Sequence, residues 1–136
     1  MKYLLAVVVL ALATPAVAGD PVAGEADFKR CKACHAITAD DGTAIQKGGK
    51  VGPNLYGVIG RQIGALEGFS YGASIVAAGA DGTVWDTAML AAYVTDPTAW
   101  LKDKTGDAGA MSKMSFKLKQ GGEDIAAYLA SVKPAG

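Results

Sequence analysis

Apolar residues recur at helical spacing in the second half of the chain, where they predict two amphipathic helices. The first follows Asp86 and Thr87, residue types that cap helix N-termini. The second follows a pair of glycines and comprises the segment EDIAAYLASV. The apolar residues that share a face are Met89, Leu90, Tyr93 and Val94 in the first helix and Ile125, Tyr128, Leu129 and Val132 in the second.

Shorter segments with helical character lie at 21–30 and 69–78. Another begins at Pro97 and continues through Leu101, since proline suits the first turn of a helix. Strand signals are scarce, because no stretch alternates apolar and polar residues for long. Glycine-rich loops connect the helices, above all between 42 and 68. We therefore expect a small all-α domain of about five helices. Its long loops have little core of their own and need a further group to pack against.

The N-terminus has the pattern of an export signal. Lys2 precedes an apolar run, and Ala-Val-Ala at 16–18 forms a cleavage site of small residues. The alternative, an uncleaved membrane anchor, fits less well because the apolar run is short. We expect a cleaved signal peptide at 1–18 and one domain at 19–136, exported to an oxidising compartment.

Charge excludes one class of function. The chain has 13 basic and 13 acidic residues, and this balance gives no reason to expect binding to nucleic acid. Lysines are nevertheless concentrated between 102 and 119, whereas 20–27 and 81–96 are acidic.

Both cysteines and the only histidine lie in the stretch CKACH, as Cys31, Cys34 and His35. A redox C-x-x-C pair would sit in a thioredoxin-like βαβ unit, which the sequence lacks. A zinc site would need further ligands, and a plain disulfide across so small a loop would stabilise little. C-x-x-C-H is the attachment signature of c-type haem, with two thioether bonds and an axial imidazole. We therefore expect one covalent haem c, bound through Cys31 and Cys34, with His35 on the iron.

The second axial ligand has few candidates. Since CKACH contains the only histidine and both cysteines, the second axial position is either bound by a methionine or open. Met89 lies on the apolar face of a predicted helix, where methionine usually fills the core. Met111 and Met114 both lie in the loop GDAGAMSKMSFKLKQGG, and loop position alone leaves both possible.

Several short motifs follow CKACH in a fixed order, and together they resemble class I cytochromes c. They are GPNLYGVIGR at 52–61, GFSYG at 68–72, Trp85, YVTDPTAWL at 93–101, SKMSFK at 112–117 and DIAAYL at 124–129. The resemblance covers essentially the whole chain after the signal peptide. The chain most resembles the soluble bacterial carriers of the cytochrome c-two and Paracoccus type. This resemblance implies the small cytochrome c fold, in which helices and loops surround one haem.

The resemblance implies roles for individual residues. Met114 would be the sixth ligand, Phe116 would lie near the exposed haem edge, and Met111 would be a neighbour. The Pro53 carbonyl would accept a hydrogen bond from His35. The residues expected to stabilise a buried propionate are Arg61, Tyr71 and Trp85, and those expected beside the methionine sulfur are Tyr93 and Ser112. Gly24 and Phe28 would meet Ile125 and Tyr128 where the first and last helices cross.

The resemblance implies a periplasmic single-haem electron carrier that cycles between Fe(II) and Fe(III), and not an enzyme. The alternative is a haem enzyme or a gas or peroxide sensor, in which the 105–114 loop moves off the iron. A monomer is expected. Its donor would be a quinol–cytochrome c reductase, and its acceptor a terminal oxidase, a nitrogen-oxide reductase or a photosynthetic reaction centre. Docking is expected through Lys32, Lys113 and Lys117, with acidic residues such as Asp20, Glu25, Asp27 and Asp86 elsewhere.

Overall fold

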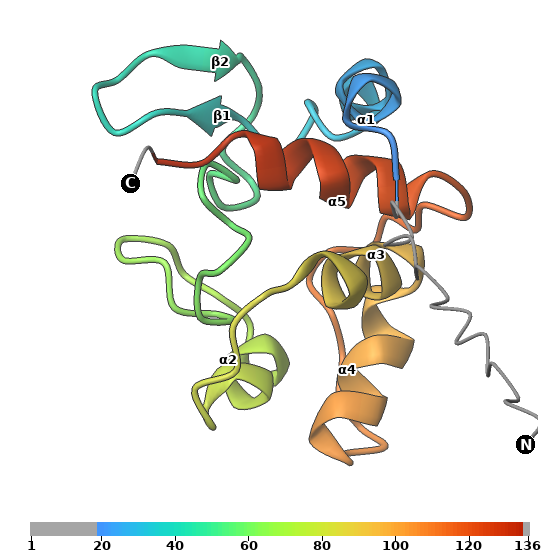
Figure 1. The fold of residues 1–136 in the computed structure, drawn as a ribbon. Helices are drawn as coiled ribbons and strands as arrows, with labels where there is room; N and C mark the ends of the chain where they lie inside the picture. The colour runs from blue at the N-terminus through green and yellow to red at the C-terminus, as the bar shows by residue number, and fades with distance from the viewer. Residues whose placement is uncertain (1–18, 135–136) are drawn as a thin grey trace, which may run out of the picture.

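The computed structural model describes residues 19–134, so the predicted signal peptide at 1–18 lies outside the described residues. Within that range five α-helices are joined by long loops and one small hairpin (Figure 1). The helices are α1 (Pro21–Asp27), α2 (Ala73–Gly79), α3 (Thr87–Thr95), α4 (Pro97–Thr105) and α5 (Gly122–Ser131). A 3₁₀ turn at Phe28–Arg30 continues α1, and the antiparallel strands β1 (Ile37–Thr38) and β2 (Ala44–Gln46) form the hairpin. The predicted small all-α fold with about five helices is confirmed.

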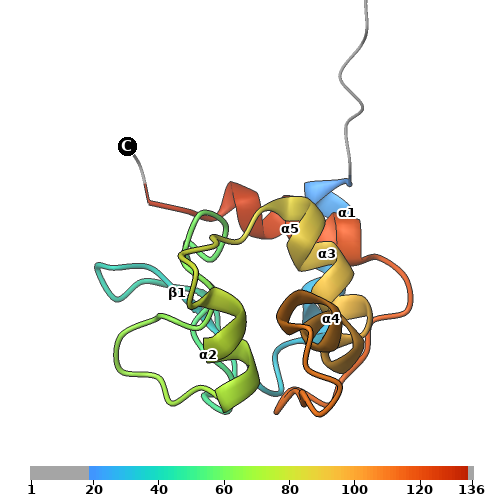
Figure 2. The ribbon, with the colours of Figure 1, turned by 90° about the horizontal axis from the view of Figure 1, so that it is seen from below.

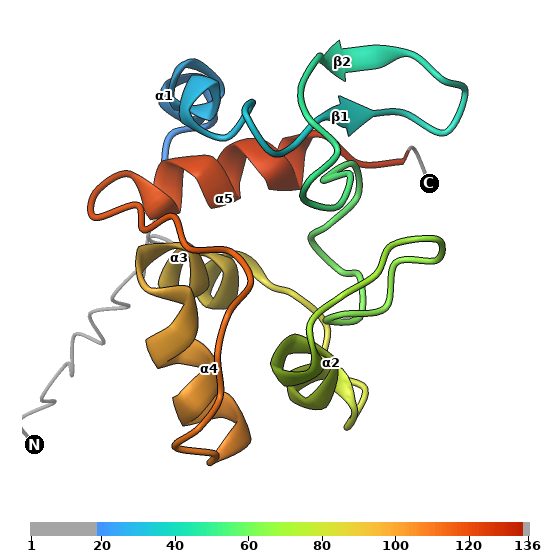
Figure 3. The ribbon, with the colours of Figure 1, turned by 180° about the vertical axis from the view of Figure 1, so that it is seen from behind.

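The first and last helices cross at close range (Figure 3). A Cβ on Gly24 would overlap the carbonyl oxygen of Asp124, so a glycine is needed for the two backbones to come this near. Phe28 packs edge-on against Tyr128, with the ring centroids 5.9 Å apart. The predicted contact of Gly24 and Phe28 with the last helix is therefore confirmed.

Two aspartates cap the helices α3 and α4. The Asp86 carboxylate accepts the N–H of Met89 at 2.7 Å and caps α3. Asp96 lies between α3 and α4, and its carboxylate accepts the N–H of Ala99 at 3.1 Å to cap α4. Asp96 is the single residue between α3 and α4 in the chain, and its extended backbone sets the turn from one helix to the next.

Some element boundaries differ from the prediction. The helix expected at 69–78 begins only at Ala73, since Gly68 has a left-handed φ of +81° and Phe69 turns to stack edge-on against Tyr71. The helix expected through Leu101 continues to Thr105, because the sequence after it contains no helix breaker before Gly106.

The β1–β2 hairpin was not predicted. Its strands contain two and three residues, too few for an alternating pattern to be recognised. Ile37 of β1 is fully buried, whereas Ala44 and Ile45 of β2 are exposed.

The core is formed by side chains from α2 to α5, from the 3₁₀ turn after α1 and from the loops and β1 between them. Seen from below, α2, α3, α4 and the loops of the first half surround the middle of the molecule (Figure 2). Its largest buried side chains include Phe28, Ile63, Trp85, Leu101 and Leu129. No helix among residues 19–134 combines the length and the apolar character needed to cross a membrane.

Candidate haem site

Cys31, Cys34 and His35 come from a single helical turn. The backbone N–H groups of Cys34 and His35 both donate to the carbonyl of Cys31, at 3.1 and 2.9 Å. This turn follows directly from α1 and its 3₁₀ extension. Both cysteines are free thiols, Cys31 half-buried and Cys34 exposed. The turn therefore presents two thiols and an imidazole next to one another.

The environment of Cys31 differs from that of a redox-active thiol. Burial, with a further contribution from Asp27, raises the pKa of Cys31 to about 11. Cysteines that carry out disulfide exchange have lowered pKa values, since the thiolate is the nucleophile. The structure therefore gives no support to the redox C-x-x-C alternative.

His35 is held by the backbone from two directions. Its Nδ1 lies 2.8 Å from the carbonyl oxygen of Pro53, and because a carbonyl only accepts, Nδ1 must donate. A Cβ on Gly52 would overlap the imidazole ring, so the ring lies directly against this backbone. Burial lowers the pKa of His35, which favours the neutral imidazole that metals bind. The ring is fixed with Nε2 available as a ligand, the arrangement that the Pro53 prediction requires.

Asn54 organises the loop beyond Pro53, and it was not among the predicted site residues. Its side-chain oxygen accepts the N–H groups of Thr38 and Tyr56, at 2.9 and 3.1 Å, and its amide donates to the Thr38 carbonyl at 2.8 Å. The backbone carbonyl of Asn54 accepts hydrogen bonds from both terminal nitrogens of Arg61, each at 3.1 Å. The only sequence signal for this role was its place in GPNLYG, directly after the proline.

Arg61 is a half-buried cation, and within residues 19–134 it forms no ion pair. Burial lowers the pKa of its guanidinium, as expected for a charge removed from water. Two of its nitrogens donate to one carbonyl, which leaves donors free for a further acceptor. A carboxylate brought in with a bound group would fit this guanidinium.

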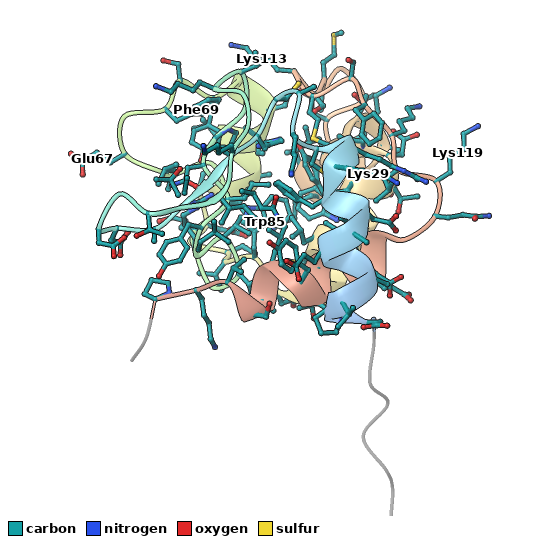
Figure 4. The ribbon with its side chains drawn as sticks, turned by 90° about the horizontal axis from the view of Figure 1, so that it is seen from above. Lys29, Glu67, Phe69, Trp85, Lys113 and Lys119 are labelled. Carbon is teal, nitrogen blue, oxygen red and sulfur yellow. The ribbon has the colours of Figure 1, made fainter. Side chains whose placement is uncertain are left out.

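The other two residues predicted around the propionate lie in different surroundings. The Tyr71 hydroxyl accepts the N–H of Leu66 at 3.3 Å. Trp85 is buried, with 5% of its surface exposed, and Figure 4 shows it in the middle of the molecule. Its indole stacks against Tyr93 and Trp100, at centroid distances of 5.1 and 5.2 Å. Trp100 is thus an aromatic neighbour of Trp85 and Tyr93 that was not among the predicted site residues.

The two candidate methionines of the loop differ in how far they are exposed to solvent. Met114 is half-buried and packs against the core, whereas Met111 is 72% exposed. Ser112 Oγ accepts the N–H of Met114 at 3.0 Å and lies 3.4 Å from the Tyr93 hydroxyl. Burial raises the pKa of Tyr93, so its hydroxyl stays protonated at neutral pH. The structure thus brings together Tyr93, Ser112 and Met114, and it leaves Phe116 42% exposed at the surface.

These residues fit a c-type haem. The fit rests on the pair of free thiols beside an oriented imidazole, on the half-buried guanidinium of Arg61, which has no carboxylate partner within residues 19–134, and on Met114, which packs against the core. Met89 packs against the core, as expected of a core residue. Among residues 19–134, no three His, Cys, Asp or Glu side chains come together in a group able to hold a metal ion.

The chain is similar in sequence to known bacterial cytochromes. It is 56% identical over 126 residues to cytochrome c2 of Rhodobacter capsulatus, which covers 93% of this chain and 92% of the relative. It is 54% identical over 129 residues to cytochrome c-550 of Paracoccus versutus, covering 92% and 84% of the two chains. No protein-family model matches the chain.

Solved structures agree with these relatives. The fold superposes on cytochrome c2 from Rhodobacter capsulatus with a TM-score of 0.83 at 56% identity, over 84% of this chain and 98% of the other. Cytochrome c2 from Paracoccus denitrificans gives a TM-score of 0.81 at 50% identity, over 83% and 95%. With this identity over nearly the whole length, the chain belongs to the class I cytochromes c of the cytochrome c2 and c-550 type.

Proposed function

We propose that this chain is a periplasmic electron carrier with one haem c bound through Cys31 and Cys34, whose iron lies between His35 and Met114. The observation that carries the proposal is the hydrogen bond between His35 Nδ1 and the Pro53 carbonyl, at 2.8 Å. It leaves Nε2 as the only ring nitrogen free for a metal, on a turn that also presents both thiols. The cytochromes most similar in sequence support the same class of function.

Haem c supplies a one-electron couple between Fe(II) and Fe(III). The protein residues set how readily that electron is gained. A methionine sulfur is a soft ligand, and together with burial it favours the ferrous form and raises the potential. The donors free on Arg61, with Tyr71 and Trp85, would hold a propionate inside the protein at reduced cost.

An enzymatic role has no support in these observations. A closed loop with Met114 on the iron leaves no position for a substrate or a gas. The relatives described above are named as cytochromes. We therefore favour the carrier over the haem enzyme or the gas or peroxide sensor.

The partners are inferred from the type of cytochrome to which the chain is similar. We infer that the donor is a quinol–cytochrome c reductase, and that the acceptor is a terminal oxidase, a nitrogen-oxide reductase or a photosynthetic reaction centre. Lys32 and Lys113 are exposed, and Figure 4 shows Lys113 at the rim of the molecule. Lys117 differs from the expectation of a free docking lysine, because its Nζ lies 3.0 Å from Asp96. Lys32 and Lys113 are therefore the stronger candidates for contact with acidic partners.

Export is proposed from the residues at the start of the chain. We infer that 1–18 are removed and that 19–136 form the periplasmic domain. The Asp20 N–H donates to Asp124 at 2.7 Å, and Gly19 lies against the first turn of α5, so the residues directly after the proposed cleavage point pack against the last helix. An intact mass of the purified protein that equals residues 19–136 plus one haem would support this proposal, and an uncleaved mass would contradict it.

The ligand assignment can be tested with two variants. Met114→Ala should abolish the ferric sulfur-to-iron charge-transfer absorption and lower the potential, because the thioether is lost. Met111→Ala should leave this absorption in place, because Met111 is 72% exposed. Loss of the band with Met111→Ala alone would show that the register of the loop is wrong.

A further inference from the structure

The Met114 loop comprises residues 110–118, and buried residues hold it at both ends. Ala110 and Leu118 are buried, with 1% and 3% of their surfaces exposed, and the Leu118 N–H donates to the Val94 carbonyl at 2.8 Å. The residues between them belong to no helix or strand. Three of their backbone N–H groups, those of Met111, Ser112 and Met114, donate to side-chain hydroxyls.

Two hydroxyl groups from different helices accept consecutive N–H groups of this loop. Ser74, in the first turn of α2, accepts the N–H of Met111 at 3.0 Å. Thr98, in the first turn of α4, accepts the N–H of Ser112 at 3.1 Å. Ser112 in turn accepts the N–H of Met114 at 3.0 Å, so the backbone of Met114 is two hydrogen bonds away from Thr98.

A second contact joins the loop to α2. A Cβ on Gly72, the N-cap of α2, would come 3.2 Å from Cγ and 3.4 Å from Cδ of Lys113. The aliphatic part of Lys113 therefore lies across Gly72, next to the Ser74 hydrogen bond. Together these two contacts close the loop against α2 at the rim where Lys113 is seen (Figure 4).

We propose that Ser74 is a positioning residue for the sixth ligand, and that it holds the Met114 loop closed against α2 while Thr98 holds it against α4. The inference rests on the proposed ligation by Met114.

The α2 side is the weaker one. Met111 is 72% exposed, so its N–H can be hydrated once the loop moves away from Ser74. Ser112 is half-buried and its hydroxyl is already engaged with Met114 and Tyr93. Opening of the loop therefore begins at Ser74, and the hydroxyl of this residue controls how often Met114 leaves the iron.

The test compares Ser74→Ala with Ser70→Ala in the purified ferric holoprotein. Ser70 is an exposed serine near α2 that makes no side-chain hydrogen bond among residues 19–134, and alanine suits the first turn of α2. Loss of one hydrogen bond worth about 1 kcal/mol should raise the population of the open loop about fivefold. Imidazole binding to the iron, which requires an open loop, should become faster and tighter by about this factor in Ser74→Ala. Ser70→Ala should match the wild type, and Ser74→Thr, which keeps a hydroxyl, should restore most of the closed state.

Amide hydrogen exchange provides a readout that does not depend on the iron ligand. The Met111 N–H should exchange faster in Ser74→Ala, while the Leu118 N–H keeps its protection. Unchanged imidazole binding in Ser74→Ala would overturn the positioning role, even if Met111 exchanged faster. An equal effect of Ser70→Ala would also overturn it. Failure of the ligand assignment itself would appear separately, as a charge-transfer band that survives Met114→Ala.

Discussion

The side chain of His35 is oriented by main-chain atoms, so the substitution that disturbs it most directly is one in the backbone beside it. A Cβ on Gly52 would overlap Cε1, Nδ1 and Nε2 of the ring. Gly52→Ala should therefore push the ring away from the Pro53 carbonyl and destabilise the holoprotein by about 1–3 kcal/mol, as overpacking generally does. Denaturant unfolding followed by the haem absorption measures this change.

A matched control is available in the loop before Met114. Gly109 has an unremarkable φ, and an added Cβ would meet only the Asp107 carboxylate, at 3.3 Å. Gly109→Ala should leave the midpoint of unfolding nearly unchanged. If the two variants unfolded at the same denaturant concentration, the close contact between Gly52 and His35 would not matter for stability.

Sequence reasoning at this scale depended on short motifs, since CKACH, GPNLYG and SKMSFK each mark a position within a few residues. The predicted contact between His35 and the Pro53 carbonyl is confirmed, whereas the ligand role of Met114 stays a prediction. Ser74 could not be predicted as a partner of Met111, because 37 positions separate them and an isolated serine has no pattern. Such contacts depend on how helices lie in space.

At the scale of elements, α2 and α4 are joined by a polar contact that predicts a pH effect. Lys104 Nζ, near the end of α4, lies 2.9 Å from Asp81 and 3.1 Å from Thr83, in the turn after α2. Hydrogen bonds from Thr83, followed by the contact with Lys104, hold the pKa of the Asp81 carboxyl well below its ordinary value near 3.8. A carboxyl with a lowered pKa stabilises the folded state above its unfolded pKa, and this stability is lost as the pH falls through the folded pKa.

Asp81→Asn should therefore lower the free energy of unfolding near neutral pH. Below about pH 4, the free energy of unfolding of this variant should fall less than that of the wild type. Denaturant unfolding of both proteins at pH 7 and at pH 3 checks this difference. Asp40→Asn serves as the control, since Asp40 is exposed and its side chain makes no hydrogen bond within residues 19–134. Parallel pH curves for Asp81→Asn and the wild type would exclude Asp81 as a source of acid sensitivity.

Helix positions were predictable to different degrees, for physical reasons. α3 begins where Asp86 caps it, and α5 has a clear apolar face, so both were located from the sequence. α2 has neither a side-chain cap nor a clear apolar face, and its start was predicted too early. The β1–β2 hairpin is stabilised by contacts such as that between Gln46 Nε2 and the Tyr128 hydroxyl, at 3.0 Å, which join distant parts of the chain.

At the scale of the whole molecule, a balanced charge conceals an uneven distribution, with 13 basic and 13 acidic residues in the chain. Lys113 is exposed at the rim beside α2, whereas Figure 4 shows Lys29 and Lys119 on another part of the surface. Lys113→Glu should slow the second-order electron transfer to an acidic partner at low salt by up to about tenfold, because it reverses the steering charge. Stopped-flow measurements at increasing ionic strength test this effect. The rates of Lys113→Glu and of the wild type should converge as the Debye length falls to about 8 Å.

Lys29→Glu is the control for this variant, because it changes the net charge equally at a different place. A rate that depends on the net charge alone would fall equally in both variants, and would exclude Lys113 as a docking residue. An unchanged visible spectrum in both variants ensures that the site itself is intact.

The hairpin tip also makes the molecule suitable for attachment to other materials. Gly42 meets no atom within 4 Å of an added Cβ, and its neighbours at 40–43 are exposed. In Figure 1 the hairpin projects from the side of the molecule opposite α2 and α4. A linker or a fluorophore introduced at this tip would leave the Met114 loop and the Lys113 rim uncovered. Immobilised on an electrode through the tip, the cytochrome would present that rim to solution, so that its exchange with partners could be followed as a current.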